Sequence, residues 1–433
     1  MNFNYLILLI PFISLPALAQ DTLSATDAVK LALENNYNIR IQKNAEAIAE
    51  NNVSLGNAGF LPEVVADAEA GASVQNTQQE FINGETNNRE NARSSNVNAG
   101  IFGTWTLFDG TRMFSSHNML EALEDLSEFE TRFVIENTIS EVLETYYQAV
   151  AYTRQVAAYE DALEFSKERM RLAEDNLELG SGSRLEMLQA QVDYNTDTTE
   201  LLRQLEQLRS TKFRLNRLIG RSISTEYEVS REIPYLNNLE LQALIDNASA
   251  QNPQILAQRK GREIANLNVN ILKSGRLPEI DLNAGYLYNR SQSEAGFLLS
   301  NQASGFNYGI TARINLFNGF NLNRQIQNAR IEVENRELQV QQLELQVSEE
   351  VFTTWNSYSN NLELARLESE NVEVARQNQE IALESFELGN ISPIELRIVQ
   401  LNFLEAENRY IEALYLLKAT ETELLRLSGQ LLQ

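Results

Sequence analysis

The sequence contains no cysteine, which excludes disulfide bonds, thiolate zinc sites, cysteine nucleophiles and a lipid-anchored N-terminal cysteine. It contains a single histidine, His117, and no HExxH motif or second histidine that would share a metal ion with it. The motifs G-x-S-x-G, G-x-x-x-x-G-K-S/T and G-x-G-x-x-G, typical of hydrolases and nucleotide-binding folds, are also missing. We therefore expect no enzymatic activity, no cofactor and no metal site.

Positive charge is scarce as well. The chain has 35 Lys and Arg residues against 60 Asp and Glu, a net charge of −25 at pH 7. Binding to nucleic acid or to anionic lipid requires clustered basic side chains, so we expect neither. The acidic excess is typical of solvated helix surfaces, and it is also compatible with an acidic passage through which cations pass more readily than anions.

Long apolar runs are confined to the N-terminus. The first twenty residues, MNFNYLILLIPFISLPALAQ, contain an apolar segment and an A-x-A cleavage pattern at Ala17–Ala19. This pattern predicts a signal peptide over residues 1–19 and export from the cytoplasm, with an N-terminal membrane anchor as the alternative. After Ala19 no run approaches the ~20 apolar residues of a membrane-spanning helix, so any membrane segment would have to consist of β-strands.

Two short markers occur twice, in the same order. GFLPE at residues 59–63 recurs as GRLPE at 275–279, and LFDG at 107–110 recurs as LFNG at 316–319. A repeat of this length indicates a duplicated unit and not a solenoid of short repeats. We expect a first structural repeat over 20–229 and a second over 230–433.

Between the markers of each repeat, apolar and polar residues alternate, which predicts a strand hairpin at about 63–108 and another at about 279–317. We expect strands of about ten residues joined by polar tips at 77–96 and 290–305. Strands of this length suit a tilted transmembrane strand with its apolar face toward lipid. The lipid-facing aromatic candidates are Trp105, Tyr286, Tyr288 and Tyr308.

A half-buried sheet in a soluble domain would show the same alternation. If the strands do lie in a membrane, four per chain are too few, because single-chain barrels begin at eight strands and an open edge cannot lie in lipid. The membrane interpretation therefore requires that several chains combine their hairpins.

Helical patterns follow each hairpin, over about 112–220 and 321–429. The stretches 112–179 and 321–388 contain no proline and are rich in helix-forming residues. At ~1.5 Å per residue, each would form a rod of roughly 100 Å, as in a coiled coil. The last helix has apolar residues at alternating steps of three and four, from Leu396 to Leu427. Shorter helices are predicted at about 25–57 and 239–273.

Both long patterns break in the same way, at LGSGSRLEM (179–187) and LGNISPIEL (388–396). In each, a glycine is followed by a serine and then, three residues later, by a glutamate, which is the pattern of a helix-capping box. We expect a sharp turn between two antiparallel helices at each break. The candidate residues at these tips are Gly180, Ser183, Glu186, Gly389, Ser392, Glu395 and Arg397.

The duplicated markers, with the turns FELG at 386–389 and LELG at 177–180, resemble those of the TolC-type outer-membrane factors over nearly the whole mature chain. The resemblance implies a mainly α protein with β structure. It implies a homotrimer whose twelve strands form one transmembrane β-barrel, continuous with a long periplasmic α-helical coiled-coil barrel. The implied location is the bacterial outer membrane, with an extension into the periplasm.

The function that this resemblance implies is the exit duct of a tripartite efflux pump or a type I secretion system. Such a duct contacts a periplasmic adaptor (a membrane fusion protein) and an inner-membrane transporter of RND or ABC type. Narrower alternatives are a duct dedicated to protein secretion or to metal-cation efflux. A periplasmic coiled-coil scaffold without pore activity is the alternative from another class.

In this family the periplasmic tips close like an iris, partly through acidic residues. The resemblance places one acidic position at Glu395, but the next, three residues on, is Ile398 in this chain. It places a residue that links to a neighbouring helix at Glu186, while the expected basic partner near 390–391 is absent. Both glutamates therefore have two open roles, helix cap and gate residue, which do not exclude each other.

Overall fold

A computed structural model describes residues 22–295 and 298–432; the predicted signal peptide lies outside these residues. The fold is mainly α with β, as predicted. The chain forms two compact units. The helical unit comprises the described parts of Met1–Ile39, Ile135–Asp246 and Glu350–Gln433, and the sheet unit comprises Arg40–Val134 and Asn247–Glu349. Each unit contains segments from both halves of the chain.

Four long helices dominate the structure. Helices α3 (Arg112–Glu178) and α7 (Asn321–Glu387) have 67 residues each, and α4 (Arg184–Leu218) and α8 (Pro393–Leu427) have 35 each. The ends of α3 and α7 agree with the predicted ranges 112–179 and 321–388 to within one residue. Among the described residues, no helix is both long enough and apolar enough to cross a membrane.

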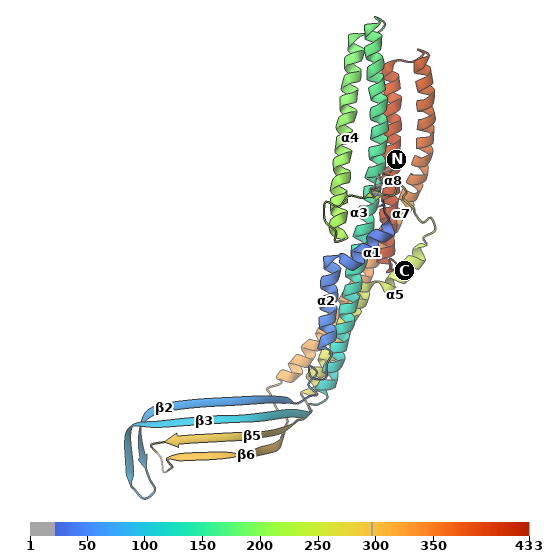
Figure 1. Ribbon diagram of the computed structural model, residues 1–433. Helices are drawn as coiled ribbons and strands as arrows, with labels where there is room; N and C mark the ends of the chain where they lie inside the picture. The colour runs from blue at the N-terminus through green and yellow to red at the C-terminus, as the bar shows by residue number, and fades with distance from the viewer. Residues whose placement is uncertain (1–21, 296–297, 433) are drawn as a thin grey trace, which may run out of the picture. The chain divides into compact units, whose positions relative to one another are not determined.

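Within the helical unit, hydrogen bonds between side chains give the helix order α4–α3–α8–α7, which Figure 1 also shows. The contacts that fix this order join Arg214 to Glu141, Asn408 to Tyr159 and Arg409 to Glu368. Helix α8 therefore lies between α3 and α7, whereas α4 and α7 occupy the two edges of the unit.

The predicted apolar stripe of α8 is confirmed, because none of its residues is exposed. Leu417 and Leu424 are fully buried, and Leu396 and Leu427 nearly so. A second buried stripe, which the heptad pattern did not include, contains Leu404, Ile411 and Leu414. It forms because α8 packs against neighbours on two sides.

The shorter helices are broken, contrary to the prediction of single helices at 25–57 and 239–273. The four segments are α1 (Ala25–Asn35), α2 (Tyr37–Asn52), α5 (Leu241–Gln251) and α6 (Pro253–Ser274). The side-chain oxygen of Asn36 accepts a hydrogen bond from the Asn38 N–H at 2.8 Å, and that of Asn252 accepts one from the Gln254 N–H at 3.0 Å. Each asparagine therefore caps the N-terminus of a new helix.

The described residues form six strands in two sheets. Strands β1 (Thr22–Leu23) and β4 (Glu228–Val229) form a short parallel pair. Strands β2 (Glu63–Glu80), β3 (Thr86–Phe108), β5 (Glu279–Ser293) and β6 (Ser300–Arg313) form an antiparallel sheet in the order β2-β3-β5-β6 (Figure 1). The hairpins of the two halves thus pair with each other, and within the described chain β2 and β6 each have one unpaired edge.

The strands are longer than the predicted ten residues, at 18, 23, 15 and 14 residues. Most of the polar segment 77–96, predicted as a loop, continues the ladder between β2 and β3. Polar side chains also pair across this extension, since the hydroxyls of Ser73 and Ser94 lie 2.8 Å apart. Strand β6 ends at Arg313, so residues 314–317 lie outside the strand predicted to reach 317.

The strand register confirms that the predicted alternation produces two different faces. Residues paired across strands share a face, and the pairs Ile101–Tyr286, Ala99–Tyr288, Trp105–Leu282 and Ala284–Tyr308 put all four aromatic candidates on one side. The other face is mainly polar, although it also includes Val65 and Leu287, and on it the Thr106 hydroxyl donates to Asp281 at 2.8 Å. Contact of the aromatic face with lipid stays a prediction.

Phe102 interrupts the alternation, because it lies on the polar face. Its ring covers Gly100 and Gly285, where a β-carbon at either position would lie within 2.9 Å of ring atoms. The two glycines therefore make room for an aromatic ring that rests on the sheet.

Candidate functional site at the helix tips

The turn at each tip begins with a glycine in the left-handed region, Gly180 with φ 76° and Gly389 with φ 73°. A β-carbon at either position would meet no atom within 4 Å, so the backbone angle, and not crowding, favours glycine. The N–H groups of Ser181 and Asn390 then bond back to the carbonyls of Asn176 and Ser385, at 2.9 and 2.8 Å. Both long helices thus end in the same C-terminal cap, and the chain reverses direction.

Both predicted capping boxes are present. At the start of α4, the Glu186 N–H donates to Ser183 Oγ at 3.2 Å, and the Ser183 N–H donates to Glu186 Oε2 at 3.0 Å. At the start of α8, the corresponding distances between Ser392 and Glu395 are 3.3 and 2.7 Å. The hydrogen bond from the Ser392 backbone N–H, followed by that from its side chain, lowers the pKa of Glu395 below its ordinary value. Glu395 is therefore ionised while it caps the helix.

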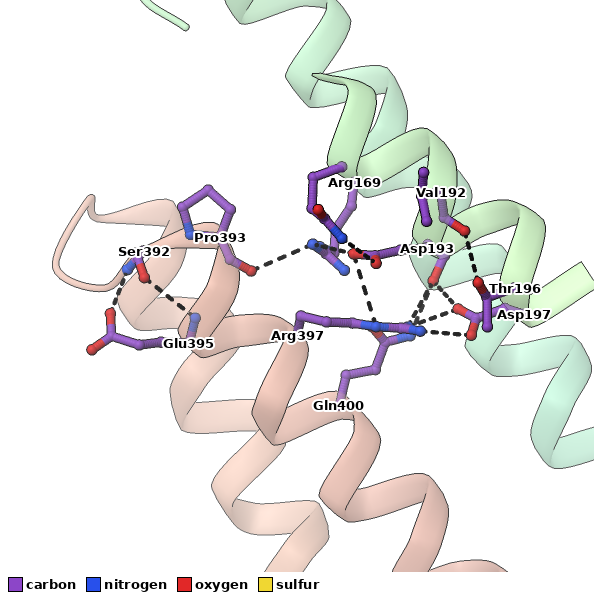
Figure 2. Close-up of polar contacts among 12 residues, drawn as sticks. Arg169, Val192, Asp193, Thr196, Asp197, Ser392, Pro393, Glu395, Arg397 and Gln400 are labelled. Atoms are coloured by element: carbon purple, nitrogen blue, oxygen red, sulfur yellow. Dashed lines mark hydrogen bonds and ion pairs between the residues drawn. The ribbon is translucent and has the colours of Figure 1, made fainter. Parts of the chain in front are cut away.

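Arg397 makes the strongest polar contact near the tips (Figure 2). Its Nη1 and Nη2 atoms each donate to a carboxylate oxygen of Asp197 on α4, both at 2.7 Å. The two side chains are almost fully buried, with 11% and 5% of their surface exposed. The Ser166 hydroxyl of α3 donates to the same carboxylate, and Arg397 Nη1 lies 3.2 Å from that hydroxyl. This contact joins three helices.

Two further groups extend this contact. Gln400 on α8 donates to the Ala162 carbonyl of α3 at 3.0 Å and accepts from Arg397 at 3.2 Å. Arg169 on α3 donates to Asp193 on α4 at 3.2 Å and to the Pro393 carbonyl of α8 at 3.4 Å. We call the set Ser166, Arg169, Asp193, Asp197, Arg397 and Gln400 the charged network.

Burial, partly offset by Asp193, lowers the pKa of the Arg169 guanidinium, and one of its nitrogens has no partner among the described residues. A buried charge of this kind is stable only while its partners are in place. The charged network therefore connects α8, from the second half of the chain, to α3 and α4, from the first half.

Of the predicted tip residues, only Arg397 belongs to the charged network. Glu186 and Glu395 are occupied in their capping boxes. Sequence reasoning missed Asp193 and Asp197, whose four-residue spacing on one helix face was the one available signal. Their partners on α3 and α8 are far away in the sequence, so no local pattern identifies them.

The two edges of the helical unit carry apolar side chains that no described part of the chain covers. On α7 and the residue that follows it, they recur every seven residues, at Leu367, Val374, Ile381 and Leu388. On α4 they are Leu185, Leu188, Val192 and Leu202. We call these the α7 stripe and the α4 stripe. A seven-residue repeat of exposed apolar residues is typical of a helix that packs against another chain.

A family model described as "Outer membrane efflux protein" matches residues 28–221 and 244–430. Protein CyaE of Bordetella pertussis is 23% identical over 332 residues, which are 73% of this chain and 65% of that protein, so the chain spans less than two thirds of its length. Outer membrane efflux protein BepC of Brucella suis is 23% identical over 91% of this chain and 84% of that protein.

Among solved structures, the Campylobacter jejuni CmeC outer membrane channel has a TM-score of 0.77 at 16% identity, with 94% of this chain and 86% of that chain covered. At this identity, the likeness concerns the fold. The proteins matched are channels and not enzymes, which supports a role other than catalysis.

Proposed function

The chain belongs to the outer membrane efflux protein family, the TolC-type outer-membrane factors, and we propose that it is the exit duct of a tripartite efflux pump or a type I secretion system. It is located in the outer membrane and extends into the periplasm. The proposal rests on one observation: each unit has two opposite edges that no described residue covers. In the sheet unit these are the unpaired sides of β2 and β6, and in the helical unit they are the apolar α4 and α7 stripes.

In the sheet unit, these edges are β2 and β6. An unpaired strand edge exposes backbone N–H and C=O groups, which lipid cannot satisfy. Four strands per chain give twelve in a trimer, and pairing β6 of one copy with β2 of the next closes them into a barrel. The face that carries Trp105 and Tyr286 would then meet lipid, and the polar face would line the lumen.

In the helical unit, the edges are the α4 and α7 stripes. They lie on opposite sides of the helix order α4–α3–α8–α7, so the α7 stripe of one copy can pack on the α4 stripe of the next. Because the two surfaces differ, the contact is heterologous, and it produces a closed ring when the rotation from one copy to the next closes after three copies. Three copies would form a tube of twelve long helices.

A duct of this kind contributes no chemistry. We propose that a periplasmic adaptor contacts the helix tips and that an inner-membrane transporter of RND or ABC type supplies the energy. The cargo is determined by that transporter, and a dedicated protein-secretion or metal-cation duct would differ in this partner. The charged network near the tips is the part of the chain best suited to hold the duct closed at rest, since its buried ion pairs resist separation of α8 from α3 and α4.

Reconstitution in planar lipid bilayers tests the duct. We expect trimers that form pores, and we expect the open pores to prefer K⁺ over Cl⁻ because the chain carries a net charge of −25. The preference should weaken as ionic strength rises, because salt screens exposed charges beyond ~10 Å at 0.1 M. A protein that stays monomeric and makes no pores would support the scaffold alternative, and anion selectivity would contradict the acidic passage.

Two single substitutions, compared with each other, distinguish the two possible roles of Glu395. Ser392→Ala removes the cap but keeps the carboxylate, and it should cost about 1 kcal/mol of stability with little change in resting conductance. Glu395→Gln keeps an acceptor at the same place but removes the charge. A higher resting conductance in Glu395→Gln alone would assign Glu395 to the gate, whereas equal conductance in both variants would leave it as a cap.

The cap should also weaken in acid. The folded-state pKa of Glu395 is lowered, so its contribution is present above the pKa of the unfolded chain and is lost as pH falls through the folded-state value.

A further inference from the structure

The tip of the β2–β3 hairpin carries an asparagine followed by a glycine, Asn83–Gly84. The chain contains one other such pair, Asn318–Gly319, just before α7. In an Asn–Gly pair, the main-chain nitrogen of the glycine can attack the side-chain amide, because glycine has no side chain to block the approach. Asparagine is among the thermolabile residues for this reason. The surroundings of the two pairs decide which of them reacts.

At the hairpin tip, the pair lies in a tight turn that is held by local hydrogen bonds. The Gly84 N–H donates to the Phe81 carbonyl at 2.9 Å, and the Phe81 N–H donates to the Glu85 carbonyl at 2.8 Å. Gly84 has φ 83°, and Asn83 Oδ1 accepts from the Glu85 N–H at 3.2 Å. Asn83 and Gly84 are exposed. Ile82, the apolar residue between them and Phe81, is fully exposed, so its side chain does not anchor the turn.

The strands that lead to this turn form a ribbon of only two strands. Strand β3 pairs with β5 from Ser94 onward, whereas residues 77–80 and 86–89 pair only between β2 and β3 (Figure 1). The ladder is also irregular between Gln75 and Thr77. An isolated two-stranded hairpin is marginally stable in water, and loop tips open at little cost in free energy. The tip therefore opens easily, and each opening releases the Gly84 nitrogen from its hydrogen bond.

Asn318 is held more firmly. Its carbonyl accepts a hydrogen bond from the Asn321 side chain at 2.9 Å, and its Oδ1 lies 3.5 Å from the Leu322 nitrogen. On either side of the pair, the rings of Phe317 and Phe320 pack edge to face, with 5.3 Å between their centroids. Opening this segment breaks these contacts and loosens the first turn of a 67-residue helix. Reaction at Asn318 should therefore be slower, although both pairs are exposed.

We infer that Asn83 is a site of spontaneous modification, at which the side-chain amide is converted to a carboxylate through a cyclic imide. The Gly84 nitrogen loses its proton and forms a bond to Asn83 Cγ, and the C–N bond of the side-chain amide breaks, so that ammonia leaves. Water then opens the ring at one of its two carbonyl carbons. Opening at Cγ gives aspartate, and opening at the main-chain carbonyl gives isoaspartate. The net change is addition of water and loss of ammonia, without an oxidant or a reductant.

Both products change the hairpin tip. Each adds a negative charge close to Glu80 and Glu85. Aspartate keeps the acceptor for the Glu85 N–H, whereas isoaspartate adds a carbon atom to the main chain, so the bond between Phe81 and Glu85 cannot close in its present register. The modification goes beyond the proposed function and does not require that the protein form pores.

Peptide mass spectrometry measures the reaction at both pairs in the same sample. The full-length protein in detergent is incubated in mildly alkaline buffer, and the fractions of aspartate and isoaspartate are followed at residues 83 and 318. We expect conversion at Asn83 to be at least about tenfold faster than at Asn318, because loop tips open at a lower free energy than helices packed in the fold. The rate should rise with pH, because the attacking nitrogen must lose its proton.

Two controls isolate the contribution of the structure. In denaturant both pairs lose their surroundings, so the two rates should approach each other. Asn83→Gln has a longer side chain that forms an imide ring less readily. It should abolish conversion at the tip on the same time scale and leave conversion at Asn318 unchanged.

Absence of conversion at Asn83 in the folded protein, while the denatured sample reacts, would overturn the proposal. Equal rates at the two pairs in the folded protein, or a faster rate at Asn318, would show that the two-stranded ribbon does not favour the reaction. A rate independent of pH would contradict attack by the Gly84 nitrogen. None of these outcomes depends on conductance, so failure here is distinct from failure of the duct.

Discussion

Arg397→Met is expected to destabilise the helical unit by about 3 kcal/mol or more, because it leaves a buried carboxylate without its ion-pair partner. Asp197 is 5% exposed and would retain only the Ser166 hydroxyl. The same variant should raise the resting conductance of the reconstituted protein, since α8 is no longer held to α4. Thermal or denaturant unfolding measures the first effect, and planar-bilayer recording measures the second.

Asp197→Leu, which replaces the other member of the ion pair, should destabilise the helical unit less than Arg397→Met. In Asp197→Leu the guanidinium of Arg397 still lies 3.9 Å from Asp193 and keeps its contact with Gln400. The double variant Arg397→Met with Asp197→Leu removes both charges, so it should regain most of the lost stability, because a buried ion pair can be replaced by apolar residues at little cost.

The double variant also separates stability from gating. If it is stable but still shows a raised resting conductance, the ion pair itself keeps the tips closed. If Arg397→Met alone is as stable as the unmodified protein, the charged network does not hold these helices together, and the gating proposal fails with it.

Aspartate at two positions of the α7 stripe, Val374→Asp with Ile381→Asp, should abolish trimer formation. Each side chain is about two-thirds exposed in the single chain and would be buried in the ring. Burial of a Val or Ile side chain contributes roughly 1.5–3 kcal/mol, and an unpaired carboxylate at the same place would oppose association. Native mass spectrometry or cross-linking in detergent reports the oligomeric state.

The matched control keeps the stripe apolar. Val374→Leu with Ile381→Leu should leave trimers intact, because the same kind of surface is buried. Val192→Asp on the α4 stripe should reproduce the loss of trimers from the other side of the contact. Trimers that survive aspartate on both stripes would show that the copies do not associate through these surfaces.

Features set by neighbouring residues could be predicted from the sequence. The ends of α3 and α7, the two capping boxes and the alternating faces of the sheet all depend on residues a few positions apart, and all are confirmed. The breaks at Asn36 and Asn252 were missed although the residues occupy matching positions in the two halves. Each asparagine caps a new helix within a stretch whose helical pattern continues without interruption, so periodicity alone does not reveal the break.

Features set by distant residues could not be predicted. Arg397 was selected as a tip residue, but its bond to Asp197 spans 200 positions and depends on how three helices pack. The extension of β2 and β3 was missed for a related reason. Its residues are polar on both faces, so the pairing follows from the backbone ladder and not from an apolar pattern.

The charged network also has a consequence for the symmetry of the duplicated chain. The two halves align at an offset of 209 through the tips, so the counterpart of Arg397 in the first half is Leu188, and that of Asp197 in the second half is Ala406. The ion pair therefore joins the α3–α4 hairpin to α8 within one chain. In the proposed ring, the corresponding contact between chains would lie between the α7–α8 hairpin and α4 of a neighbour. No ion pair can form there, because Leu188 takes the place of Arg397 and belongs to the α4 stripe. In the proposed ring of six helical hairpins, the three junctions within chains are ionic, and the three junctions between chains are apolar. A ring of six identical half-chains could not make this distinction, which depends on the sequence differences between the two halves at these positions.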